Sequence, residues 1–155
     1  SAIASMLWKR WPLEHFAAVG KALAQKYNAH ILIFGGPDET AQMQELAKQL
    51  PGIASQVTAP LLTTAAAIKH CAIFLSNDSG LMHVAAAVGV PTYGLFGPTD
   101  EVTTGPRGES SHVIRAAGTK PVFNTESNYY LDQTTHETLL RLSPELVLQQ
   151  LRFPV

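Results

Sequence analysis

Residues 72–97, AIFLSNDSGLMHVAAAVGVPTYGLFG, decide the fold of this chain. The stretch predicts a buried strand over residues 72–76, a polar turn at residues 77–80, an Ala-rich helix over residues 81–88 and a second strand over residues 90–96. Both strands are continuously apolar, which is typical of parallel strands that helices cover on both faces. The stretch therefore indicates a β-α-β unit of a parallel sheet.

The remainder of the chain continues this alternation. Further helices are expected over residues 12–27, with Asn28 as the stop, and over residues 39–50, 63–69 and 143–151. Further strands are expected over residues 30–34, 53–57 and 112–115, and a long loop over residues 116–134. Asp38, and Thr63 or Thr64, are the expected caps of two of these helices. The pattern predicts an α/β fold with a doubly wound parallel sheet. Such a domain normally has a strand before its first helix, so we expect this one to lack its first strand.

Length and charge limit the classes of function that this chain can have. The 155 residues favour one domain over residues 1–155, and a net charge of −1 without a basic block argues against a nucleic-acid surface. No run of about 18 apolar residues is present, so we expect no transmembrane segment. Cys71 is the one cysteine, which fits a reducing compartment. Between His70 and Thr99, Asp78 is the one Asp, Glu, Lys or Arg.

Three turns follow predicted strands, where open parallel sheets bind their ligands. They are residues 35–39, residues 77–80 and residues 97–99, and the last of them contains Gly97 and Thr99. Glycine in such a turn lets the backbone approach a ligand closely. We therefore expect a binding site at the carboxyl ends of the strands.

The turn before the Ala-rich helix is the best candidate for a phosphate site. A helix N-terminus offers unpaired N–H groups and the positive end of a dipole, which together bind phosphate. The amides of Ser79, Gly80 and Leu81 would supply the donors, and the Ser79 hydroxyl could add another. The alternative is that Asp78 or Ser79 only caps the helix, which is common for these residue types. Three consecutive candidate caps at residues 77–79 are more than one helix needs.

Three further side chains could act on such a ligand. His83 lies about one turn into the helix and could contact a phosphate, or it could be a half-buried histidine of that helix. Lys9 stands before a helix start, where a bound anion would offset the unfavourable dipole, or it could be a solvated cation. Glu39 could accept both hydroxyls of a ribose, or it could only stabilise the first turn of its helix.

Other catalytic templates are absent from the sequence. It contains neither Gly-x-Gly-x-x-Gly nor a Walker motif, and no Gly-x-Ser-x-Gly elbow surrounds Ser79. His136 and Glu137 lack the second histidine of a zinc-binding helix. We therefore expect no metal site and no cofactor.

The motifs together resemble one known family. Residues 77–87 (NDSGLMHVAAA), Gly-Val-Pro at residues 89–91 and Leu-Phe-Gly-Pro-Thr at residues 95–99 resemble the signature of the bacterial heptosyltransferases of lipopolysaccharide core synthesis, glycosyltransferase family 9. Lys-Arg-Trp-Pro at residues 9–12 and Gly-Gly-Pro-Asp-Glu at residues 35–39 match the family's other motifs in the same order. The resemblance covers nearly the whole chain, and its central motif is specific.

The resemblance implies the C-terminal half of a GT-B enzyme, in which two Rossmann-like domains face a cleft. This half would hold the nucleotide-sugar donor, usually ADP-heptose. The implied donor site consists of Lys9, Glu39, Asp78, Ser79, Gly80, Leu81, His83, Gly97 and Thr99. Lys9 would support the departing ADP, Glu39 would hold the ribose, Asp78 would bind sugar hydroxyls, His83 would support the diphosphate, and residues 59–62 would lie near the adenine.

The implied reaction is metal-independent sugar transfer. Negative charge develops on the leaving diphosphate, and fixed cations and N–H dipoles can stabilise it. The resemblance assigns the general base and the lipopolysaccharide core acceptor to a missing N-terminal domain, so we expect this domain alone to be inactive. It would work in the cytoplasm, at the inner face of the inner membrane. The alternatives are a non-catalytic nucleotide-sugar binding module and a domain of another GT-B enzyme such as a sugar-nucleotide epimerase.

Overall fold

Strands and helices alternate in the computed structural model, which describes residues 10–121 and 137–153. The helices are α1 (Leu13–Tyr27), the 3-10 turn η2 (Pro37–Glu39), α2 (Thr40–Lys48), α3 (Leu61–Lys69), α4 (Gly80–Ala87), α5 (Glu101–Thr104), α6 (Glu137–Leu140) and α7 (Pro144–Gln150). The strands are β1 (Ile31–Phe34), β2 (Ala54–Val57), β3 (Phe74–Asn77), β4 (Thr92–Phe96) and β5 (Ser111–Arg115). Each predicted strand is present.

The described strands form two parallel sheets. β1 pairs with β2, and β4 lies between β3 and β5. All three pairings are parallel, which confirms the predicted Rossmann-like α/β fold. Within the described ranges, no strand connects β1 to β3. This break lies where a doubly wound sheet would place the first strand that the domain is expected to lack.

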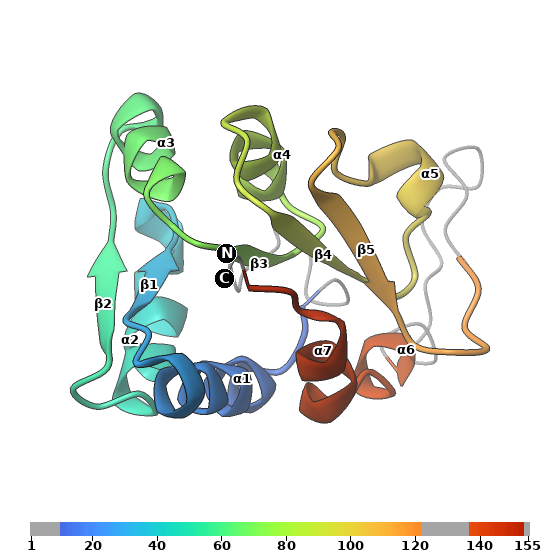
Figure 1. Ribbon diagram of the computed structural model, residues 1–155, viewed down its shortest axis with the longest axis horizontal. Helices are drawn as coiled ribbons and strands as arrows, with labels where there is room; N and C mark the ends of the chain where they lie inside the picture. The colour runs from blue at the N-terminus through green and yellow to red at the C-terminus, as the bar shows by residue number, and fades with distance from the viewer. Residues whose placement is uncertain (1–9, 122–136, 154–155) are drawn as a thin grey trace.

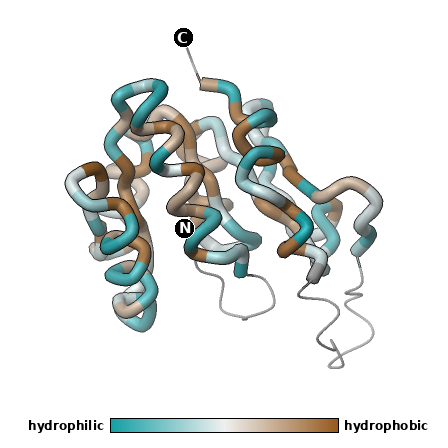
Figure 2. Tube along the Cα trace, turned by 90° about the horizontal axis from the view of Figure 1, so that it is seen from below, coloured by the Kyte–Doolittle hydropathy of each residue, from teal (hydrophilic) through white to brown (hydrophobic). Residues whose placement is uncertain are grey.

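Helices cover both faces of the strands. In Figure 1, α1 and α7 lie below the strands and α3 and α4 lie above them. The larger core lies between α1, α2, α7 and the strands, and the smaller one packs Ile68 and Ala85 of α3 and α4 against Phe34 and Phe74. Hydrophobic and hydrophilic residues alternate along the outer helices (Figure 2), as expected for helices with one buried face.

Two helix boundaries follow directly from sequence signals. α1 begins after Pro12 and ends at Asn28, which adopts the left-handed conformation at φ 51°. α7 begins after Ser143, whose hydroxyl accepts a hydrogen bond from the Leu146 N–H at 3.3 Å. The start of each helix can be predicted from the sequence because a proline or a side-chain cap marks it.

Two predicted caps are wrong. A 3-10 turn that starts at Pro37 precedes α2, and Glu39 rather than Asp38 is the N-cap residue. α3 begins directly after Pro60, so neither Thr63 nor Thr64 caps it. In both places the proline fixes the backbone earlier than the polar residue does.

The sequence did not predict two short helices, α5 and α6. α5 and α6 have four residues each, too few to show a hydrophobic period. The signal for α5 is Asp100, whose Oδ1 accepts a hydrogen bond from the Val102 N–H at 2.9 Å. Of the predicted loop at residues 116–134, residues 116–121 contain no helix or strand, and the rest lies outside the described residues.

Candidate functional site

Two of the predicted turns meet at one edge of the three-stranded sheet. β3 and β4 are parallel neighbours with Asn77 opposite Leu95, so the chain leaves both strands at the same edge. The turn after β3 leads into α4, and the turn after β4 leads into α5. The Thr104 hydroxyl at the end of α5 shares its proton between Asp78 Oδ2 at 3.2 Å and the Asp100 carbonyl at 3.1 Å. The fold therefore brings Asp78 close to α5, the helix that follows the turn after β4.

The chain that enters α1 is fixed at the same edge. The Trp11 backbone N–H donates to Asn77 Oδ1 at 2.9 Å, and the Trp11 indole Nε1–H donates to the Leu142 carbonyl at 2.7 Å. Trp11 is 1% exposed. Lys9, the predicted cation, lies outside the described residues. The residues that follow it are nevertheless held beside the turn after β3.

The N-terminus of α4 has no side-chain cap. Ser79 is the N-cap residue, and its side chain makes no hydrogen bond to the helix. The Ser76 hydroxyl donates to the Asn77 carbonyl at 2.7 Å, so Ser79 Oγ is the donor to Ser76 Oγ at 2.9 Å. Ser79 thus holds the N-cap position, but the alternative that its hydroxyl caps α4 is wrong. The backbone N–H groups at this end remain available as donors toward solvent.

Within residues 10–121 and 137–153, the space next to Gly80 is open. No atom of these residues would lie within 4 Å of a Cβ atom built on Gly80. Leu81 is partly buried against the smaller core, which anchors the first turn. His83 is exposed, so the alternative of a half-buried histidine is wrong. A ligand could therefore reach both the Gly80 backbone and the His83 ring.

Arg115 holds the turn after β4. Its guanidinium donates to the carbonyls of Gly97 and Thr99 and forms an ion pair with Glu101. Thr99 is 3% exposed, and a Cβ atom on Gly97 would lie 2.6 Å from Leu139 Cγ. The structure thus gives Gly97 and Thr99 packing roles, and their contact with a ligand stays a prediction.

The sequence pattern did not single out Arg115 or Glu101. Arg115 ends a predicted strand, and this position at the carboxyl edge is the signal that could have identified it. Burial raises the pKa of Glu101, but the hydrogen bond and the charge of Arg115 outweigh it, so the pKa of Glu101 is lowered. The pair is therefore ionised at neutral pH and clamps the turn.

Glu39 already has a local partner. Its Oε2 accepts a hydrogen bond from the Gly36 N–H at 2.7 Å and closes the turn after β1. This is the local role that the sequence left open, and it leaves the second carboxylate oxygen for other donors. Leu61 and Leu62, in the segment expected near the adenine, are 61% and 84% exposed.

The other titratable groups in the described part of the chain form no metal site. Within residues 10–121 and 137–153, no three His, Cys, Asp or Glu residues are placed to hold a metal ion. No helix in these ranges is long and apolar enough to cross a membrane. Cys71 packs against the smaller core, and burial raises the pKa of its thiol.

Comparison with protein families gives one match that spans most of the chain. The family described as "Glycosyltransferase family 9 (heptosyltransferase)" matches residues 2–131. The chain belongs to glycosyltransferase family 9. The matched range of this family 9 chain includes all three turns and Lys9.

Relatives of this family 9 chain are longer proteins. Lipooligosaccharide heptosyltransferase 2 of Haemophilus influenzae is 30% identical to it over 153 residues, with 92% of this chain and 42% of the relative covered. The chain spans less than half the length of the curated relatives that it matches over 92% of its residues.

Solved structures share the fold. The structure of E. coli ADP-heptose lps heptosyltransferase II has a TM-score of 0.75 and 28% identity, with 91% of this chain and 40% of that chain covered. E. coli heptosyltransferase WaaC with ADP-2-deoxy-2-fluoro heptose has a TM-score of 0.72 and 25% identity, with 96% and 40% covered. These likenesses confirm the fold predicted from the sequence.

Proposed function

We propose that residues 1–155 form the donor-binding domain of a heptosyltransferase of lipopolysaccharide inner-core synthesis, and that the donor is ADP-heptose. Family membership supports this, as does the likeness to an enzyme solved with ADP-2-deoxy-2-fluoro heptose. The observation that carries the proposal is the uncapped N-terminus of α4 beside Asp78, where β3 and β4 leave the sheet. A diphosphate fits this position by charge and by hydrogen-bonding capacity.

In the proposed site the diphosphate lies against the amides of Ser79, Gly80 and Leu81. These N–H groups and the helix dipole attract its negative charge without a counter-ion. His83 adds a donor from the exposed face of α4, and Lys9 neutralises the leaving ADP from the segment before α1. Gly80 lets the phosphate oxygens approach the backbone closely.

The sugar and the ribose are bound by carboxylates. Asp78 is 8% exposed and held by Thr104, so its orientation is fixed before the sugar binds. It accepts hydrogen bonds from the heptose hydroxyls. Glu39 keeps its bond to Gly36 and uses its second oxygen for the ribose. Leu61 and its neighbour Leu62 provide exposed apolar surface for the adenine.

In the proposed reaction this domain stabilises the leaving group only. As the anomeric C–O bond breaks, negative charge grows on the diphosphate, where the α4 amides and Lys9 oppose it. The general base that activates the acceptor hydroxyl and the lipopolysaccharide core itself belong to a further, N-terminal domain. The complete enzyme works on the cytoplasmic side of the inner membrane.

Isothermal titration calorimetry of the chain with ADP, UDP and GDP tests this function. We expect ADP to bind more tightly than either of the other nucleotides. Preference for UDP would contradict the ADP-heptose assignment and favour a different GT-B enzyme. Failure of all three to bind would contradict the donor-binding function itself.

A further inference from the structure

The short helix α5 contacts Asp78 although the two are far apart in the sequence. The Thr104 hydroxyl, 26 residues further along the chain, lies 3.2 Å from Asp78 Oδ2 and 3.1 Å from the Asp100 carbonyl. Asp78 Oδ2 therefore has a donor in place, and the carboxylate keeps acceptor capacity for a ligand. The position of α5 thus bears on how the Asp78 carboxylate is oriented.

α5 is too short to hold its own position. It has four residues, and a single helical turn is unstable without outside contacts. Asp100 stabilises this turn, because its Oδ1 accepts from the Val102 N–H at 2.9 Å and its Oδ2 accepts from the Thr103 hydroxyl at 3.1 Å. These bonds lie within residues 100–103, so they fix the shape of the turn and not its place on the sheet.

Arg115 fixes the place of α5 on the sheet. Arg115 ends β5, opposite Phe96 of β4, and its guanidinium pairs with Glu101, the first residue of α5 (Figure 1). The same guanidinium donates to the carbonyls of Gly97 and Thr99. The side chains of Arg115 and Glu101 are 13% and 30% exposed, so solvent screens the ion pair only in part.

The two ends of α5 are packed against each other. Gly105 directly follows α5, and its N–H donates to the Glu101 carbonyl at 2.8 Å. A Cβ atom built on Gly105 would lie 2.3 Å from that carbonyl oxygen, so this contact requires a glycine. Thr104 is the neighbour of Gly105. A displacement of Glu101 is therefore passed on to Thr104.

We propose that Thr104, Glu101 and Arg115 are positioning residues for the sugar of the donor. Arg115 holds Glu101 and, through it, α5. The Thr104 hydroxyl at the end of α5 then holds the Asp78 carboxylate in the orientation that accepts the heptose hydroxyls. The inference rests on the proposed function, because it requires that Asp78 binds the sugar. The contact is made to the Asp78 side chain rather than to the backbone of α4, so it acts on binding of the sugar and not of the diphosphate.

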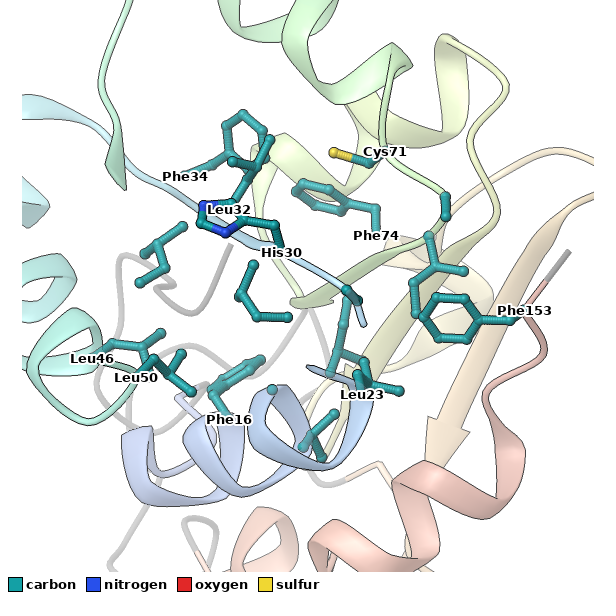
Figure 3. Close-up of a pocket in the computed structure, with 18 of the residues that line it drawn as sticks. Phe16, Leu23, His30, Leu32, Phe34, Leu46, Leu50, Cys71, Phe74 and Phe153 are labelled. Atoms are coloured by element: carbon teal, nitrogen blue, oxygen red, sulfur yellow. The ribbon is translucent and has the colours of Figure 1, made fainter. Parts of the chain in front are cut away.

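A change of stability elsewhere in the fold provides a control. An apolar cavity of about 450 Å³ lies between the two sheets, and the described residues 97–115 take no part in its lining. Figure 3 shows the side chain of Leu23 of α1 directed toward this cavity. Leu23→Val removes part of this buried side chain, which destabilises the fold without a change next to Asp78.

Isothermal titration calorimetry of the 155-residue chain with ADP-heptose and with ADP tests the proposal. The ratio of the two affinities measures what the sugar contributes. We expect Thr104→Val, which replaces the hydroxyl by a methyl group, to lower this ratio about threefold to tenfold, the range for one lost hydrogen bond. Thr104→Ser keeps the hydroxyl and should restore the native ratio. Equal ADP affinity in both variants shows that they are folded.

Two control variants should keep the native ratio. Thr103→Val removes a hydroxyl from the same helix, one that is bonded to Asp100 and not to Asp78. Leu23→Val lowers stability at the distant cavity. A fall of the ratio in either control as large as that in Thr104→Val would overturn the assignment of Thr104.

A double-mutant cycle tests whether Glu101 acts through Thr104. At neutral pH, Glu101→Gln should lower the ratio about twofold to fivefold, the range for a partly exposed ion pair. In the Thr104→Val background the same substitution should lower it no further, because the hydroxyl that passes the effect to Asp78 is gone. Effects that multiply would show that Glu101 acts by another route and would overturn its assignment.

The variant Asp78→Asn separates this inference from the proposed function. If the native chain prefers ADP-heptose to ADP and Asp78→Asn removes the preference, Asp78 binds the sugar, and an unchanged ratio in Thr104→Val then overturns the inference alone. If Asp78→Asn keeps the native ratio, the proposed sugar contact is wrong and the inference falls with it. Equal losses of ADP and ADP-heptose affinity in Thr104→Val would show that α5 supports the whole site, which also overturns the inference.

Discussion

The fold does not require a glycine at position 80, and the proposed function assigns its missing side chain to the approach of a phosphate. The position has no positive φ, and no atom of the described residues crowds a Cβ atom built on it. Gly97 is the opposite case, because Leu139 occupies the space that a side chain would need. In the sequence, Gly80 and Gly97 are both glycines in turns after strands. The contact distances in the structure distinguish the open position at Gly80 from the packed position at Gly97.

The variant Gly80→Ala tests the role of this glycine. We expect the free energy of unfolding to stay the same or to rise by as much as ~1 kcal/mol, because alanine favours the helix. ADP affinity should fall roughly tenfold, since the methyl group would push a phosphate away from the amides. Calorimetry and urea unfolding measure both, with Thr63→Ala on the exposed face of α3 as control. Unchanged ADP affinity would contradict phosphate binding at α4.

The ion pair between Glu101 and Arg115 holds the turn after β4, and its contribution to the free energy of unfolding should depend on pH. The lowered pKa of Glu101 means that its pairing with Arg115 adds stability above the ordinary carboxyl pKa of about 4.3, and that this stability is lost as the pH falls through the lowered value. We expect Glu101→Gln to be less stable than the native chain at neutral pH and equally stable well below pH 4. Urea unfolding across this range measures the difference. A difference independent of pH would exclude the ion pair as its cause.

Among the helices and strands, the sequence predicts those with a long apolar run or a clear start signal and does not predict the shortest helices. The apolar runs of β1, β3 and β4 are long enough to be identified, and Pro12 and Ser143 mark their helices clearly. α5 and α6 have four residues each and carry no period, and a proline ahead of each helix overrode the caps expected for α2 and α3. The clamp by Arg115 depends on contacts between residues far apart in sequence, which no local pattern encodes.

The junction between α1 and the residues before α7 depends on one indole. In Trp11→Phe the Leu142 carbonyl loses its donor, and a buried acceptor left without a partner costs about 1–3 kcal/mol. Urea unfolding should show this loss. The backbone bond to Asn77 does not involve the indole and is retained in this variant. We therefore expect the free energy of ADP binding to change less than the free energy of unfolding. An unfolding midpoint equal to that of the native chain would contradict the importance of this bond.

In the complete enzyme, we propose that this chain binds the donor and that another domain carries the general base. The chain covers less than half the length of its heptosyltransferase relatives, and the proposed general base lies outside it. We expect the isolated chain to bind ADP and to transfer no heptose from ADP-heptose to a lipid A–Kdo acceptor. A radiolabelled transfer assay measures this. Full turnover by the chain alone would refute the division of roles.

An NMR titration of the isotopically labelled chain with ADP, with adenosine as the control, tests directly whether a diphosphate binds at the N-terminus of α4. We predict that ADP shifts the amide signals of Ser79, Gly80 and Leu81, the donors proposed for the diphosphate. Adenosine, which lacks the diphosphate, should leave these three signals in place. If saturating ADP binds elsewhere and leaves all three amide signals unshifted, the N-terminus of α4 is not the diphosphate site.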